Sequence, residues 1–89
     1  MKNIQNKITD NGVANGLDWA ITSIPSSLDY VQVAYSLVSI NEGSTNVVKS
    51  GNITFTTIAE LETIIVDGTI VMSEITEKVA KTLGVVLIN

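Results

Sequence analysis

Two carboxylates, Asp18 and Asp29, are the side chains of this sequence that come nearest to a catalytic constellation. Both lie near ends of predicted strands, where they could converge as a carboxylate pair that divides acid and base work. Asp29, however, follows Pro25 and two serines, and acidic residues at such positions commonly serve turns. The turn is the favoured interpretation, and no catalytic residue is assigned.

The segment from Asp10 to Asp18, DNGVANGLD, has oxygen ligands and two glycines, as calcium-binding loops do. It lacks the acids at alternate positions and the closing bidentate glutamate that such loops use. Tandem turns at Asn11-Gly12 and Asn15-Gly16 explain the same residues. The sequence therefore predicts no metal site and no cofactor, with calcium as the weaker alternative.

Several residue types that carry chemistry are absent from the chain. There is no His, no Cys and no Arg. The commonest general acid–base group, thiolate nucleophiles, disulfides and cysteine-based metal sites are thereby excluded. No glycine-rich phosphate-binding motif occurs either. We therefore expect a protein that is not an enzyme.

Charge and composition favour contact with other proteins. The 89 residues carry a net charge of −4, and only 16% of them are charged while 45% are hydrophobic. A typical soluble domain has about 25% charged residues. Nucleic acid is a poor partner for a chain without arginine, since Arg supplies the bidentate contacts to phosphate and guanine. A small domain with so few charges is expected to bury part of its surface against protein.

The N-terminal residues predict neither a signal peptide nor a domain of their own. They lack the apolar core of a signal peptide, and no uncharged run reaches the roughly 18 residues of a membrane span. The expected location is a virion or the cytoplasm. Residues 1–16 are predicted to form a polar, mobile N-terminal arm, in which Ile4 and Ile8 suit either one helical turn or a short edge strand. Residues 17–89 are predicted to form a single domain.

Alternation of apolar and polar residues predicts the strands. Residues 17–24 are expected to form a strand, with a short helix as the alternative. Residues 28–40 and 47–57 should pair antiparallel, with an apolar face shared by Val31, Val33, Tyr35, Leu37, Ile53 and Phe55. We expect Tyr35 opposite Ile53 and Val33 opposite Phe55, joined by a loop of about five residues.

The residues after Thr57 allow two interpretations. Thr57 and Glu60 have the spacing of a capping box that opens a short helix. The β-branched residues around the turn signal Asp67-Gly68 favour instead a hairpin from Ile64 to Val71, in which Ile65 opposes Ile70 and Ile64 opposes Val71. The hairpin is the favoured interpretation, with one helical turn before it.

A helix should follow the hairpin. Ser73 is expected to cap it, Ile75, Val79 and Leu83 lie on one face, and Gly84 ends it. VVLI, residues 85–88, then reads as a short terminal strand. The predicted fold class is α+β: a small, mainly antiparallel sheet with one C-terminal helix followed by a short strand.

The hairpin and the terminal strand are apolar on both faces, and one helix covers only one face of a sheet. Either the N-terminal strand covers the other face or another chain does. If another chain does, the interface candidates are Ile64, Val66, Val71, Val86 and Ile88.

Two functions fit these observations. The favoured hypothesis is a structural or assembly protein that acts through protein–protein contacts, as a homo-oligomer or as a subunit of a particle such as a bacteriophage virion. The alternative is a small acidic binding module or inhibitor of a cellular protein, seeded by a cluster of Asp10, Asp18 and Asp29.

Overall fold

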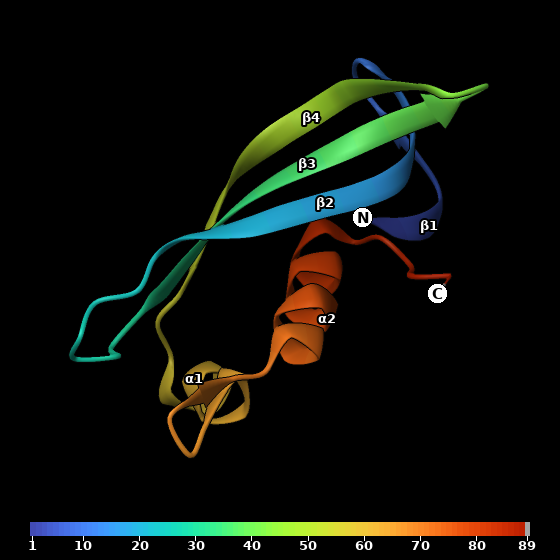
Figure 1. Cartoon of the computed structure of the whole chain (residues 1–89). Coiled ribbons are helices and arrows are strands. Elements are labelled where there is room, and N and C mark those ends of the chain that lie inside the picture. Colours follow the sequence, from blue (N-terminus) through green and yellow to red (C-terminus); the bar gives the residue numbers. More distant parts are fainter. Residues whose placement is uncertain (89) are drawn as a thin grey trace.

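The computed structural model, which describes residues 1–88, consists of an antiparallel sheet with a helical layer on one face (Figure 1). Strands β1 to β4 are neighbours in chain order, and a two-stranded hairpin, β5–β6, lies between two helices. The α+β class is confirmed, but there are two helices where one was expected. The elements are β1 (Lys2–Thr9), β2 (Gly12–Ser23), β3 (Val31–Asn41), β4 (Ser44–Phe55), α1 (Ile58–Ile64), β5 (Ile65–Val66), β6 (Thr69–Ile70) and α2 (Met72–Leu83).

The core lies between the sheet and α2, because alternate residues of each strand point to the same face. In β3, Val31, Val33 and Leu37 are buried, while Gln32 and Ser36, which alternate with them, are only partly buried. The predicted alternation is therefore confirmed from Val31 to Leu37; the next residue, Val38, is buried as well. The buried cluster on the helical side also includes Leu17, Phe55, Ile64, Ile75 and Val79.

The β3–β4 register differs by two residues from the one predicted. Val33 pairs with Ile53, and Val31 pairs with Phe55. Odd-numbered residues do oppose odd-numbered ones there, so the shared face was predicted correctly. The turn is tighter than expected, because only Glu42 and Gly43, both with positive φ, lie between the strands. A bulge near Val48 then shifts the pairing by one residue.

Residues 1–16 belong to the sheet, which corrects their description as an arm beside the domain. They form β1, the short edge strand of the two alternatives, and the first part of β2; Ile4 is buried in the core. Asn15-Gly16 makes no turn. The Asn15 amide instead bonds both backbone groups of Ile40, at 2.9 Å to the oxygen and 2.7 Å from the nitrogen.

The segment after α2 returns to β1 and lies along its free edge. Gly84 ends the helix in the left-handed conformation. The backbone nitrogen of Gln5 then donates to Val86 at 2.9 Å, and that of Ile88 donates to Asn3 at 3.0 Å. The expected terminal strand is thus a single antiparallel bridge, Ile4 to Leu87, because only these few residues reach β1.

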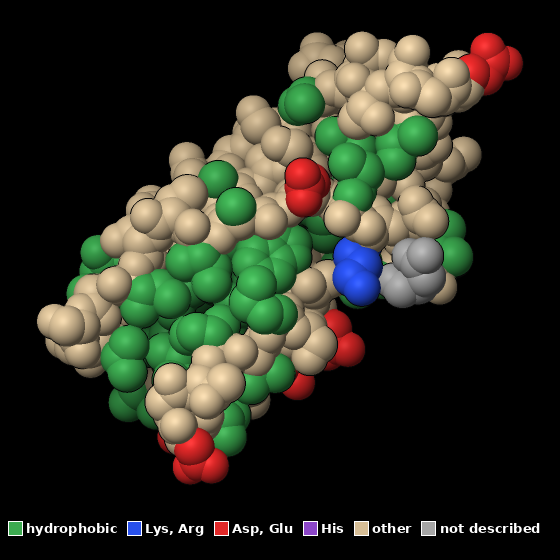
Figure 2. Space-filling view, in the orientation of Figure 1, with side chains coloured by type: hydrophobic (Ala, Val, Ile, Leu, Met, Phe, Trp, Pro, Cys, Tyr) green, Lys and Arg blue, Asp and Glu red, His purple; other side chains and the backbone are tan. Residues whose placement is uncertain are grey.

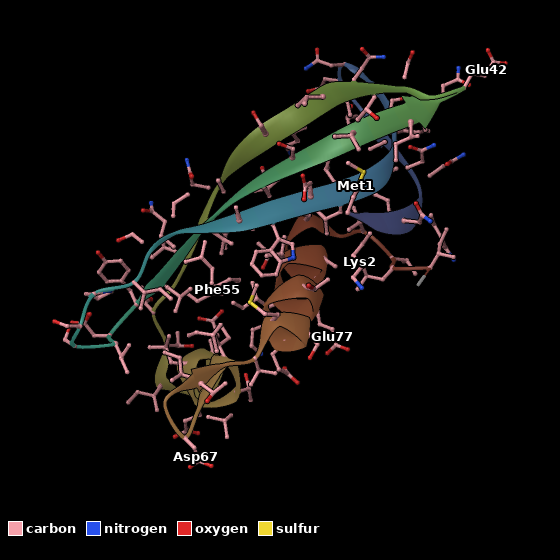
Figure 3. The ribbon with its side chains drawn as sticks, in the orientation of Figure 1. Met1, Lys2, Glu42, Phe55, Asp67 and Glu77 are labelled. Carbon is pink, nitrogen blue, oxygen red and sulfur yellow. The ribbon has the colours of Figure 1, made fainter. Side chains whose placement is uncertain are left out.

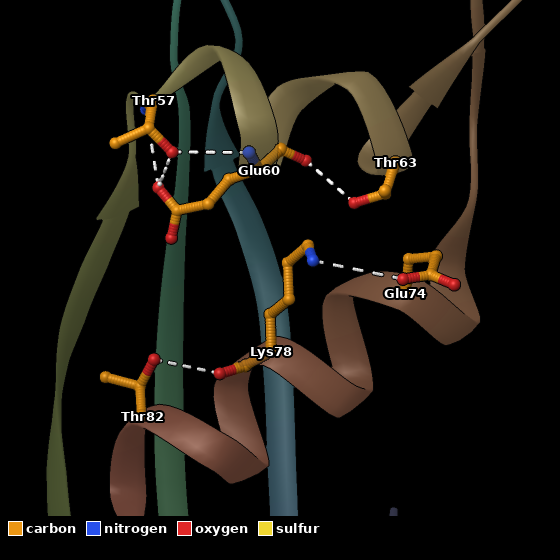
Figure 4. Close-up of polar contacts among 6 residues, drawn as sticks. All are labelled: Thr57, Glu60, Thr63, Glu74, Lys78 and Thr82. Atoms are coloured by element: carbon orange, nitrogen blue, oxygen red, sulfur yellow. Dashed lines mark hydrogen bonds and ion pairs between the residues drawn. The ribbon is translucent and has the colours of Figure 1, made fainter.

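Helix α1 occupies part of the predicted hairpin. Both bonds of the capping box are present: Thr57 Oγ1 accepts from the Glu60 nitrogen at 3.2 Å, and Glu60 Oε1 accepts from the Thr57 nitrogen at 3.3 Å (Figure 4). These bonds satisfy backbone N–H groups at the start of the helix, which have no partner within it, and the helix continues to Ile64. The hairpin is therefore reduced to two residues in each strand.

The turn of that hairpin and one of its pairs were predicted correctly. Asp67 and Gly68 both have positive φ, and Ile65 pairs with Ile70. Ile64 ends α1, and its oxygen accepts a bond of 2.7 Å from the backbone of Val71.

Helix α2 begins before the position predicted for its cap. Its N-cap residue is Val71, which makes no side-chain cap, so the role expected of Ser73 is wrong. Ile75 and Val79 are buried as predicted, and Leu83 packs at the border of the core. Glu74 and Lys78 form an ion pair of 3.9 Å on the helix surface (Figure 4).

Phe55 is only 1% exposed, and its loss would leave a cavity beneath the sheet (Figure 3). Replacing a buried Phe by Ala typically costs about 3–5 kcal/mol, which is a large share of the stability of a small domain. Phe55→Ala should therefore lower the free energy of unfolding by this amount, measured by thermal and urea denaturation. Val47→Ala, at an exposed position of the same strand, is the control; equal effects of the two variants would contradict the placement of Phe55.

Candidate interaction surface

The acidic residues singled out in the sequence do not come together. Asp10 lies in the β1–β2 turn, Asp18 is in the middle of β2, and Asp29 follows the far end of that strand. Along a strand, eight residues span roughly 26 Å. Within residues 1–88 no group of three acidic side chains is arranged to hold a metal ion. These acids therefore form neither a carboxylate pair nor the seed of an acidic patch.

The segment proposed as a calcium loop is mostly strand. Asp10 and Asn11 form the turn, which the Thr9 hydroxyl braces by donating to the Gly12 oxygen at 2.6 Å. Asn11 Nδ2 donates to the oxygen of Val48 at 3.3 Å, so this turn reaches across to β4. The oxygen-rich residues of the segment thus serve the β1–β2 hairpin.

Hydrophobic side chains gather at the end of the molecule that carries α1 and the β5–β6 hairpin (Figure 2). There, a groove of about 270 Å³ lies between the β2–β3 loop and α1. We call it the α1 groove; Leu28, Ile58, Leu61, Glu62 and Ile65 line it. Ile58 is 76% exposed although it is aliphatic. Four of the five lining residues are apolar, and this is the surface expected of a protein contact.

A larger groove of about 450 Å³ lies between α2 and the C-terminal segment. Lys2 from β1 and Glu77 from α2 line it from two sides (Figure 3), and Met72 and Ile88 supply exposed apolar surface. Beside it, the indole nitrogen of Trp19 donates to the buried hydroxyl of Thr76 at 2.9 Å. That bond satisfies the one polar atom of the Trp side chain at the border of the core.

The five predicted interface residues lie in different environments. Ile64 is fully buried within its own chain and is a core residue, because α1 turns its side chain toward α2 and the sheet. Val71 is half-buried at the start of α2. Val66, Val86 and Ile88 are 46%, 54% and 63% exposed, so these three are accessible to a partner.

The outer edge of β4 is a further surface, and sequence reasoning missed it. β4 has 12 residues and is the last strand of the sheet. Among residues 1–88, no backbone hydrogen bond joins the outer edge of β4 to another segment. Alternation shows that a segment is a strand, but it does not show which strand ends the sheet, so the sequence carried no signal for this edge.

Comparison with known protein families, curated proteins and solved structures gives no significant match to this chain. In the described part of the chain, no helix has the length and apolar character needed to cross a bilayer.

The different burial of Ile64 and Val66 predicts opposite responses to a charge. Ile64→Lys would place an unpaired ammonium in the core, at a cost of several kcal/mol, and should unfold the domain. Val66→Lys places the same group in water and should leave the fold intact. Circular dichroism and thermal melting of both variants test this; a folded Ile64→Lys variant would show that this residue is not in the core.

Proposed function

We propose that this protein is a structural or assembly protein without enzymatic activity, which acts through protein–protein contacts. In this proposal it self-associates or forms part of a larger particle, of which a bacteriophage virion is one kind. The observation that carries the proposal is the α1 groove, where Leu28 and the strongly exposed Ile58 lie beside half-buried Leu61 and Ile65.

The cost of leaving such side chains in water supports this function. Burying an aliphatic side chain of this size contributes roughly 1.5–3 kcal/mol, so a partner that covers Ile58 gains from it. Single exposed apolar residues are ordinary, but here several surround one groove. The low proportion of charged residues makes the surrounding surface cheaper to desolvate.

The chemistry of the side chains also supports a role in contact. His and Cys are absent from the sequence, and Asp10, Asp18 and Asp29 lie apart along β2 and its flanking turns. Ser, Thr and Asn are the commonest polar residues of the sequence, and they can hydrogen-bond at an interface without burying a charge.

Ile58→Glu tests the proposal without weakening the fold. Ile58 is the first residue of α1, where an added carboxylate is favourable to the helix dipole. We expect the wild-type protein to associate as its concentration rises and the variant to remain a folded monomer. Light scattering coupled to size-exclusion chromatography, with circular dichroism for folding, measures both.

Val47→Glu is the matched control. Val47 is also an exposed aliphatic residue, but it pairs with Val38 on the part of the sheet beyond the bulge, away from α1. Its variant should associate as the wild type does. Wild-type protein that stays monomeric at high concentration would reject self-association.

A further inference from the structure

We propose that two copies of this chain pair through the outer edges of their β4 strands, antiparallel and centred on Ile53, so that their sheets join into one. This inference rests on the proposed function in one respect, namely that the protein self-associates. It adds the surface, the register and the charged contacts of that association.

The free part of the β4 edge has defined limits. At one end the bulge near Val48 interrupts the strand, and the β1–β2 turn contacts it through Asn11. At the other end Thr57 caps α1 and the extended backbone stops. Between them, residues 50–57 contain neither a charged residue nor a proline. Natural edge strands are usually protected by such residues, so this stretch is open to another strand.

The limits of the free stretch determine the register. An antiparallel pair of identical strands has a twofold axis, and the pairing that uses the whole stretch from Lys49 to Thr57 is centred midway, on Ile53. In this register Ile53 opposes Ile53 of the second copy, and Asn52 opposes Thr54. Opposed residues then lie on the same face in both copies, so both helical layers cover one side of the joined sheet.

Charge complementarity favours a second copy as the occupant. Lys49 is exposed, pairs with Leu37 and therefore lies on the helical face; within residues 1–88 it makes no ion pair. In the proposed register it opposes Thr57 of the second copy. Glu60 is held beside Thr57, with its Oε1 2.8 Å from Oγ1. Each Lys49 ammonium thus meets the Glu60 carboxylate of the other copy, and the symmetry gives two such contacts.

The apolar residues at this edge are consistent with the same occupant. Ile53 is only half-buried in one copy, and Ile58 directly follows the end of the free stretch. A second β4 strand on the edge covers Ile53 and brings its own bulge region opposite Ile58. The pairing therefore removes apolar surface from water on the helical side and places Asn52 and Thr54 together on the polar side.

A single cysteine tests the register, because the chain contains none of its own. In Ile53→Cys the two thiols would be directly opposite, with Cα atoms about 4.5–5.5 Å apart, within the range that a disulfide spans. We expect oxidised glutathione to convert this variant into a covalent dimer. Ser50→Cys is the control, since in this register the two copies of residue 50 are roughly 20 Å apart.

A mixture of Asn52→Cys and Thr54→Cys proteins tests the same register at two exposed positions, should Ile53→Cys fold poorly. Their heterodimer, identified by mass, should form faster than either homodimer. Ser50→Cys that crosslinks as fast as Ile53→Cys, or a mixture without preference for the heterodimer, would overturn the register.

A double-mutant cycle tests the proposed contact between Lys49 and Glu60 of the second copy. Glu60→Gln retains a capping-box side chain but loses the charge. Lys49→Gln and Glu60→Gln should each weaken dimerisation roughly three- to tenfold by light scattering, and the double variant should be no weaker than either. If the double variant instead weakens dimerisation by the product of the two single effects, the contact between Lys49 and Glu60 is rejected. If the wild type associates but neither folded Ile53→Cys nor the Asn52→Cys and Thr54→Cys mixture crosslinks, the proposed function stands and the β4 pairing fails. If the wild type is always monomeric, self-association and the β4 pairing both fail.

Discussion

The packing of α2 against one face of the sheet is the interaction on which the rest of the structure depends. Ile75 and Val79 are fully buried in one cluster with Leu17, Val33 and Phe55 from three neighbouring strands. Because a strand alternates its side chains, this contact fixes which residues of each strand point inward, and a slip by one residue would expose them all. Polar residues such as Gln32 and Ser36 alternate with them on the other face.

The helical layer is too short to cover the whole sheet. A strand of 12 residues such as β4 extends roughly 40 Å, whereas a helix of 12 residues such as α2 extends about 18 Å. The molecule is accordingly elongated, 42 Å by 21 Å by 21 Å, and the β3–β4 turn projects beyond α2 (Figure 1). Trp19 and Ile53 lie half-buried at the border of the core. Accessible apolar surface is thus a geometric result of long strands under short helices.

Local patterns predicted β3, β4 and the second half of β2, the α2 stripe and the Asp67-Gly68 turn, because each depends on residues close in the chain. They did not predict the β3–β4 register, because the Glu42-Gly43 turn is tighter than expected and the bulge near Val48 inserts one residue. Even-numbered residues oppose odd-numbered ones between the turn and the bulge, and odd oppose odd beyond it. Residues 57–66 carry two local signals, the capping box of a helix and the β-branched residues of a hairpin, and the structure forms the helix as far as Ile64. The Thr57–Glu60 capping box satisfies its donors locally and forms α1, so Ile64 points into the core and was misplaced as an interface residue. The α1 groove joins segments some 30 residues apart, which periodicity cannot bring together.

The two edges of the sheet differ, and this difference is informative because an edge strand is a liability in any soluble protein. At β1 the segment after α2 occupies the edge, with backbone bonds from Gln5 to Val86 and from Ile88 to Asn3. Among residues 1–88, the bulge, the Asn11 bond to Val48 and Lys49 protect the β4 edge, and all three lie at one end of a stretch that is otherwise neutral. A monomer would gain from a charge or a proline in residues 50–57, and such a substitution needs no change in the core. The absence of both from this edge, beside an exposed Ile58, is what pairing with a second copy requires.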